Sequence, residues 1–286
     1  MALLLWGASV ALKASLPSLR RSRACAACAP PPPAPYAPLA PGASVTIAGR
    51  VLVSRHADLL RLELLSEPSA IQSEWHLSRR LAPDYAGAIA ERARAALPRG
   101  GQLLLLGLGG GSIAGQLLCG ASAAAGVRVA AVEADAAVAA AARDYFFPAM
   151  FAGSRRRAAR RLRVAVADAR RVAAGDAPPP RGAAGPYDVI VEDFAYAAHG
   201  GVGVGFWRAL RERHAAPRAT LLVNTLYTHF TEHERLERDL RRAGWGGIRR
   251  TVERGLQAEA AAEAAAEAWT PGDNMIVSAV NLEGER

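Results

Sequence analysis

A loop rich in glycine follows a short, wholly apolar run near the middle of the chain. The run is Leu103–Leu106, and a helical pattern begins near Ser112. The glycines between them are Gly107, Gly109, Gly110 and Gly111. Glycine lets the backbone turn tightly after a buried strand, and the amides of the loop and of the next helix then face a ligand at the carboxyl end of that strand. This order of strand, loop and helix predicts a site for a nucleotide-type cofactor.

Acidic residues stand at or just after the ends of three further apolar runs. They are Glu133, Asp168 and Asp193. Glu133 lies about 22 residues after the loop, where an acid accepts hydrogen bonds from ribose hydroxyls in NAD and S-adenosylmethionine sites alike. Asp168 is placed to bond an adenine amino group, and Asp193 lies at the lip of the next strand. Because the carboxyl ends of parallel strands meet in one crevice, the acids and the loop predict a single site. For each acid alone, a solvated strand-end carboxylate is the alternative.

The spacing of the glycines argues against a dinucleotide. The dinucleotide fingerprint needs a third glycine where this chain has Ser112, and the pattern shifted to end at Ala114 is offset toward the helix. A nicotinamide cofactor therefore remains the less favoured alternative.

The elements that must position these residues alternate between strands and helices. We expect strands over 103–106, 127–132, 162–166, 187–191, 219–224, 248–253 and 275–280. We expect helices over 85–97, 113–125, 136–145, 206–214 and 232–243, with a further exposed helix over 257–268. Strands that are apolar throughout and alternate with helices indicate an α/β fold, a parallel sheet covered on both faces. The final strand pair predicts a doubly wound, Rossmann-like sheet of seven strands whose last strand is antiparallel.

The region before the main sheet divides into two parts. Two β-type runs, 45–53 and 59–65, predict a small N-terminal hairpin or sheet within a region of residues 45–100. Residues 1–44 contain no acid and carry a proline tract, so we expect a disordered, targeting-like N-terminus. Such a segment is typical of a transit peptide that directs a protein to a plastid or mitochondrion. The alternative is that residues 1–44 are an ordinary disordered tail, in which case we expect the protein to be cytoplasmic. Residues 101–286 form the predicted cofactor-binding domain.

The charge of the chain is concentrated in two segments. The 286 residues carry a formal net charge of +9. Residues 1–44 contribute +4 and six arginines between 155 and 163 contribute +6, so the rest carries −1. This pattern disfavours a nucleic-acid partner, although a phosphate or acidic-tail contact at the arginine run is the alternative. Three cysteines exclude a disulfide scaffold, no metal site is predicted, and no apolar run is long enough to span a membrane.

The blocks around the loop and the acids resemble the spermidine synthase-like branch of the class I S-adenosylmethionine-dependent methyltransferases. The matching blocks are 105–112, 132–135 with 142–146, 167–169 and 187–193, in the family's order and spacing. Ile71-Gln72-Ser73 with Tyr85 also resembles the family's entry into the domain. The resemblance covers about residues 45–283 and implies the methyltransferase variant of the doubly wound sheet.

The resemblance implies a cofactor and a reaction. S-adenosyl-L-methionine would lie on Gly107, Gly109, Gly110 and Gly111, with its ribose on Glu133 and its adenine near Asp168. Asp193 would contact the methionine end of the cofactor, and it is the candidate catalytic residue that orients or deprotonates the acceptor. The implied activity is methyl transfer to an unknown acceptor, a small molecule or a protein side chain, in an enzyme that can form a homodimer.

Two positions depart from the aminopropyltransferases of this branch. Those enzymes hold the amino-acid-like tail of the cofactor with an Asp where this chain has Gly110, and they carry a second Asp where it has Tyr196. The departures disfavour polyamine synthesis. An aminopropyltransferase and a catalytically inactive cofactor-binding homologue remain the alternatives.

Overall fold

The computed structural model describes residues 39–66, 71–82, 84–119, 126–154, 158, 160–183, 185–194, 202–226, 230–253 and 274–282. All of them belong to one compact unit that spans residues 36–286. The targeting-like segment lies outside the described residues up to position 38, as does the helix expected over 257–268, so both stay predictions.

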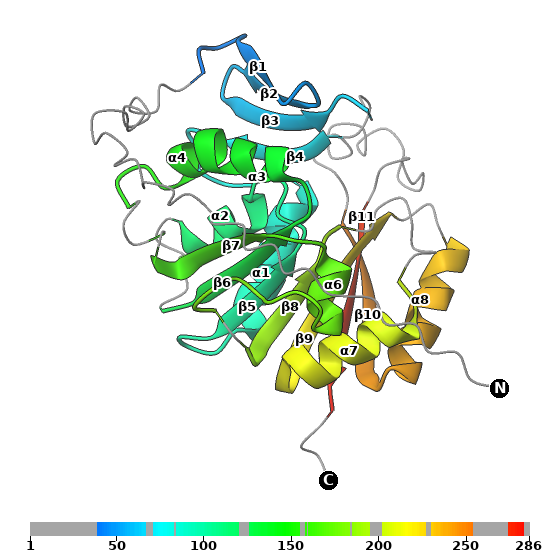
Figure 1. Ribbon diagram of the computed structural model, residues 1–286. Helices are drawn as coiled ribbons and strands as arrows, with labels where there is room; N and C mark the ends of the chain where they lie inside the picture. Colours follow the sequence, from blue (N-terminus) through cyan, green and yellow to red (C-terminus); the bar gives the residue numbers. More distant parts are fainter. Residues whose placement is uncertain are drawn as a thin grey trace, which may run out of the picture. The chain divides into compact units, whose positions relative to one another are not determined.

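Seven strands form the main sheet in the order β10-β11-β9-β8-β5-β6-β7 (Figure 1). Their bounds are β5 (Gln102–Leu106), β6 (Arg128–Glu133), β7 (Leu162–Val166), β8 (Tyr187–Glu192), β9 (Ala215–Leu226), β10 (Trp245–Glu253) and β11 (Asn274–Asn281). The strands from β9 through β8, β5 and β6 to β7 pair in parallel, whereas β11 is antiparallel to both of its neighbours. The predicted doubly wound sheet with an antiparallel last strand is confirmed.

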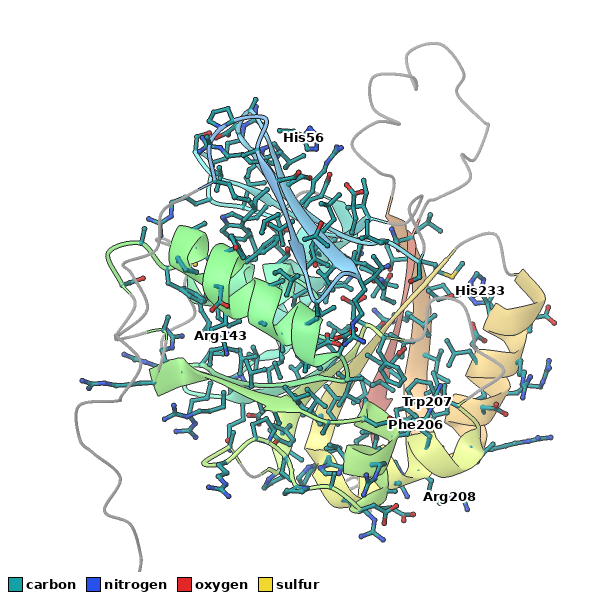
Figure 2. All side chains as sticks on the ribbon, turned by 45° about the horizontal axis from the view of Figure 1, so that its top comes forward. His56, Arg143, Phe206, Trp207, Arg208 and His233 are labelled. Carbon is teal, nitrogen blue, oxygen red and sulfur yellow. The ribbon has the colours of Figure 1, made fainter. Side chains whose placement is uncertain are left out.

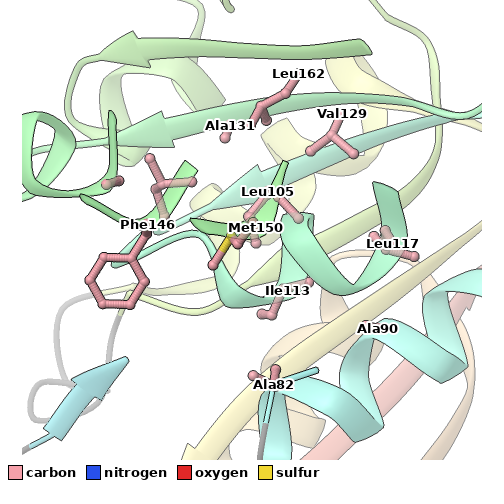
Figure 3. Packing of buried hydrophobic residues seen from close by; sticks show 14 of the residues in the cluster. Ala82, Ala90, Leu105, Ile113, Leu117, Val129, Ala131, Phe146, Met150 and Leu162 are labelled. Atoms are coloured by element: carbon pink, nitrogen blue, oxygen red, sulfur yellow. The ribbon is translucent and has the colours of Figure 1, made fainter. Parts of the chain in front are cut away.

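Helices cover both faces of this sheet. They are α1 (Asp84–Ala96), α2 (Ser112–Leu118), α3 (Ala136–Ala141), the π-helix η2 (Ala142–Phe146), α4 (Phe147–Met150), α6 (Ala169–Ala174), α7 (Val204–His214) and α8 (Phe230–Arg242). The four leucines of β5 are fully buried, and they alternate between two apolar clusters. One cluster joins the sheet to α1, α2 and α4 (Figure 3), and the other joins it to α6, α7 and α8. A strand buried on both faces explains the continuous apolar run in the sequence.

A four-stranded antiparallel sheet precedes the main sheet in the chain. It consists of β1 (Ser44–Ile47), β2 (Val51–His56), β3 (Leu59–Leu64) and β4 (Ile71–His76), paired in chain order. The run predicted over 45–53 is two strands instead of one, because Ala48 and Gly49 have φ angles of 50° and 68° and turn the chain. β4 has a polar sequence that carries little strand signal, and its fully buried Trp75 anchors it to the core.

The helix predicted over 136–145 differs from the structure in its middle. It begins as α3, widens into the π-helix η2 and continues as α4. A π-turn inserts one extra residue into a helix, and such turns are frequent at functional sites. Here the insertion brings Phe146 and Phe147 against the glycine loop. None of the described helices is long and apolar enough to cross a membrane.

Candidate functional site

The glycine loop makes a sharp turn at the carboxyl end of β5. Gly107, Gly109 and Gly111 have φ angles of 93°, 54° and 83°, a region that side chains disfavour. A Cβ atom on Gly107 would lie only 2.4 Å from the backbone oxygen of Asp193. The loop therefore passes directly against the end of β8, and glycine is required there for both conformation and space.

The Glu133 carboxylate is bound to the loop. Its Oε2 accepts hydrogen bonds from the backbone N–H groups of Leu108 and Gly109, each at 3.1 Å. Its Oε1 accepts one from the N–H of Asp135 at 2.9 Å. Three of about four acceptor positions of a carboxylate are thus used by the protein. Glu133 holds the loop in shape and has about one acceptor position left for a ligand hydroxyl.

Asp193 lies on the other side of the loop from Glu133, because β5 stands between β6 and β8 in the sheet. Its N–H donates to the carbonyl of Leu106 at 2.7 Å, and its Oδ1 accepts a hydrogen bond from Asn224 Nδ2 at 2.8 Å. Asn224 is 1% exposed. This amide fixes the orientation of the carboxylate from the neighbouring strand β9.

The end of β9 carries further buried polar groups that the sequence interpretation missed. Thr225 follows Asn224, and its hydroxyl lies 3.1 Å from Nε2 of His233. His233 belongs to the first turns of α8 and is labelled in Figure 2. His233 and Glu192 are both fully buried. The available signal was the change from the apolar stretch 221–223 to Asn224 and Thr225, because polar residues at the carboxyl end of a buried parallel strand mark a site.

Asp168 lies one strand further from the loop than Glu133. Val166, the last residue of β7, pairs with Glu133, so Asp168 lies two residues past the end of that strand. Its side chain is exposed and accepts a hydrogen bond from the N–H of Arg170 at 2.7 Å, which caps α6. The structure thus brings the loop, Glu133 and Asp193 into contact, and it sets Asp168 at the edge of the same end of the sheet.

The strand β4 forms a wall beside the loop. The hydroxyl of Ser73 accepts a hydrogen bond from the N–H of Gly110 at 2.7 Å, and Ser112 Oγ donates to the carbonyl of Glu74 at 2.7 Å. A Cβ on Gly109 would lie 2.5 Å from Ser73 Oγ. The small N-terminal sheet is therefore part of the site, a role the sequence had suggested only through a family resemblance.

Several other residues near the site have structural roles. Asp135 caps α3 through the N–H of Ala137 and pairs with Arg50 at 2.7 Å. Cys119 is buried in the core, where burial raises the pKa of its thiol to about 11. Tyr196, at the position where aminopropyltransferases carry their second Asp by the resemblance, lies outside the described residues. Within the described part of the chain, no group of three or more His, Cys, Asp or Glu residues is arranged to hold a metal ion.

Comparison with known proteins identifies the fold. No family model matches the chain. No curated protein matches it in sequence. The crystal structure of spermidine synthase from Thermotoga maritima superposes with a TM-score of 0.58 at 14% identity, over 84% of this chain and 72% of that one. The chain has the fold of spermidine synthase.

Two further solved structures resemble the chain more distantly. TrmN from Thermus thermophilus has a TM-score of 0.43 at 17% identity over 68% of this chain. The phosphoethanolamine N-methyltransferase 2 of Haemonchus contortus, in complex with S-adenosylhomocysteine, has a TM-score of 0.43 at 13% identity over 68% of this chain. The chain spans about half the length of each, 48% and 52%. At these identities the likeness concerns the fold alone.

Within the spermidine synthase fold, Gly110 is enclosed by two side chains. A Cβ at this position would lie 2.7 Å and 2.8 Å from two ring carbons of Phe146, and 2.9 Å from Cβ of Ser73. Phe146 is fully buried, so its ring can move only by displacing its neighbours. The loop has no room for a side chain at the position where, by the resemblance, aminopropyltransferases carry an Asp.

Proposed function

We propose that this chain is an S-adenosyl-L-methionine-dependent methyltransferase. Two features of the glycine loop together carry the proposal. The Glu133 carboxylate accepts hydrogen bonds from two loop N–H groups, and Phe146 and Ser73 occupy the space that a side chain at Gly110 would need. The first feature suits an S-adenosyl cofactor, and the second removes the acid typical of aminopropyltransferases.

The residues present fit this cofactor. The loop offers a surface without side chains, because Gly107, Gly109 and Gly111 are required by the backbone. Glu133 is half-buried and keeps acceptor capacity for a ribose hydroxyl, and the exposed Asp168 is accessible to an adenine amino group. Asp193 is half-buried beside the loop, toward the methionine end expected for the ligand.

The chemistry asked of the protein is positioning. Bound S-adenosylmethionine would supply an electrophilic methyl group, so catalysis depends on orienting the acceptor and excluding water. Asp193, held by Asn224, is the group that would orient an acceptor amine or hydroxyl, or take its proton. The proposed acceptor is a small molecule or a protein side chain.

A thermal-shift panel tests the proposal. The ligands are S-adenosylmethionine, its decarboxylated form, methylthioadenosine and NAD. A ligand at about 100 times its Kd stabilises the native state by about 2.7 kcal/mol, which corresponds to a rise of about 5–10 °C in Tm for a chain of this size. We expect S-adenosylmethionine to give the largest shift, and Asp193→Asn to lower the rate of methyl transfer by a larger factor than it lowers cofactor affinity. A larger shift with NAD, or none with any ligand, contradicts the proposal.

The second candidate is an aminopropyltransferase, which the likeness to the Thermotoga maritima spermidine synthase favours. It requires the decarboxylated cofactor to bind more tightly than S-adenosylmethionine, together with putrescine-dependent turnover. An inactive homologue would bind S-adenosylmethionine without transferring its methyl group to any acceptor. The panel and a turnover assay with radiolabelled cofactor distinguish these three outcomes.

A further inference from the structure

The strand β7 is an edge strand of the main sheet, and its outer edge presents backbone N–H and C=O groups. Among the described strands its one neighbour is β6. The N–H of Ala167 donates to the carbonyl of Glu133 on β6 at 2.9 Å. Because alternate residues of a parallel strand bond to the same neighbour, Val164 and Val166 direct their N–H and C=O groups away from β6. Val166 is 56% exposed and Val164 is 37% exposed.

A basic cavity flanks this edge on the α6 side of the sheet. Its volume is about 720 Å³, and three arginines line it: Arg163, Arg171 and Arg181. The rest of its lining comes from β7 and the residues after it, 164–168, and from the segment 177–180; Asp168 is the acid among them. Three arginines face a single acid in this lining, so the potential inside the cavity is positive.

An apolar pocket flanks the same edge on the opposite face. Its volume is about 340 Å³, and its lining includes Phe147, Phe151, Leu162 and Val164. Leu162 packs in the cluster on the α2 side of the sheet and Ala167 packs in the cluster on the α6 side. By strand alternation, a chain paired with β7 would place every second side chain over the apolar pocket and the others over the arginines.

We propose that β7 binds an extended segment of a partner protein in which acidic and apolar side chains alternate. The segment would add a strand to the sheet, with its backbone paired to Val164 and Val166, its acids toward the arginines and its apolar residues toward Phe147 and Phe151. This inference does not depend on the proposed methyl transfer.

Charge and lining distinguish this partner from the other candidates. A second copy of the chain would bring two arginine-lined cavities face to face, which costs free energy through like-charge repulsion. Single-stranded nucleic acid uses aromatic side chains for base stacking, and none lines the basic cavity. An acidic peptide uses both the arginines and the backbone groups of the strand edge.

Fluorescence anisotropy with labelled heptapeptides tests the proposal. The probe is Glu-Val-Glu-Val-Glu-Val-Glu, and the controls are the same composition with the alternation broken and the version with Lys in place of Glu. We expect the alternating acidic peptide to bind most tightly and to lose affinity as salt rises. Val166→Pro removes one outward N–H and leaves the bonds to β6, so we expect affinity to fall at least about five-fold. Val166→Thr keeps the N–H and is expected to bind as the unmodified protein does.

Charge reversal gives a second, independent test that leaves the strand intact. Arg171 and Arg181 are exposed, and we expect Arg171→Glu/Arg181→Glu to weaken binding about ten-fold. The matched control is Arg208→Glu/Arg242→Glu on α7 and α8, which makes the same change in net charge at exposed positions and should leave binding unchanged. Equal binding of the scrambled peptide, an equal loss in the control variant, or tighter binding of an oligonucleotide of the same charge overturns the proposal.

Discussion

The tight enclosure of Gly110 predicts a large effect from the smallest side chain. We expect Gly110→Ala to destabilise the protein although its backbone conformation there suits alanine. The added Cβ would meet the Phe146 ring at 2.7 Å and 2.8 Å and Ser73 at 2.9 Å. Real Cβ atoms almost never approach other atoms this closely, so the buried ring, the serine or the loop must shift.

The magnitude follows from the cost of overfilling a packed interior. Inserting a methyl group into a well-packed site costs about 1–3 kcal/mol, which lowers Tm by about 2–4 °C for each kcal/mol in a chain of this size. A shift of the loop would also lengthen the 2.7 Å bond from the N–H of Gly110 to Ser73. We therefore expect cofactor affinity to fall together with stability.

The assay is urea unfolding followed by circular dichroism, in a double-mutant cycle with Phe146→Ala. Removing the ring alone costs about 3–5 kcal/mol, but it also removes two of the three clashes. The double variant should therefore be more stable than the sum of the single effects predicts, by about 1 kcal/mol or more. Gly205→Ala is the control, because its Cβ would meet nothing within 4 Å and alanine favours the helix. Additive effects in the cycle, or a Gly110→Ala variant as stable as the unmodified protein, would refute the packing described.

Three further predictions concern the loop, one histidine and one cysteine. Glu133→Ala leaves three N–H groups without their acceptor. We therefore expect the free energy of unfolding in urea to fall by about 1–3 kcal/mol, and S-adenosylmethionine to bind more weakly in calorimetry. A loss of binding without any loss of stability would show that the loop does not need Glu133. Burial lowers the pKa of His214 below its usual 6.5. The native state therefore resists protonation of this ring, and the free energy of unfolding should fall as the pH drops below about 6.5. His214→Gln should flatten this dependence in urea midpoints measured from pH 7.5 to 5, whereas His56→Gln, at an exposed site, should not. Burial raises the pKa of the Cys119 thiol to about 11, so this thiol should react with a thiol reagent only after unfolding. If all three cysteines of the chain react in the native protein, the burial of Cys119 is contradicted.

The sheet and the residues around the loop were predictable because each has a local cause. The strand 162–166 was predicted with its observed bounds, and the runs 103–106 and 187–191 were each one residue short. Their apolar character follows from burial on both faces. The positions of Glu133 and Asp193 follow from the ends of β6 and β8.

The features that the sequence missed depend on contacts between distant segments. The π-turn at Ala142–Phe146 has the composition of an ordinary helix, and its aromatic residues lie beside a loop that is distant in the sequence. Ser73 lies 37 residues from Gly110 in the chain. Its strand, β4, contains too few apolar residues to be predicted as a strand. Asn224 and His233 became recognisable as partners of the site only when β9 and α8 were in place.

The place of β11 in the sheet has a consequence for biosynthesis. This strand, Asn274–Asn281, comes after β9 and β10 in the chain, yet it lies between them and hydrogen-bonds to both. During translation, β9 and β10 emerge first and have no strand between them until residue 281 has been made. A chain that stops before residue 274 therefore leaves the edge of β9 that β11 covers without its partner, and it leaves β10 without its neighbour in the sheet. Unpaired strand edges are templates for aggregation, so we expect chains that end before β11 to aggregate more readily than the full chain.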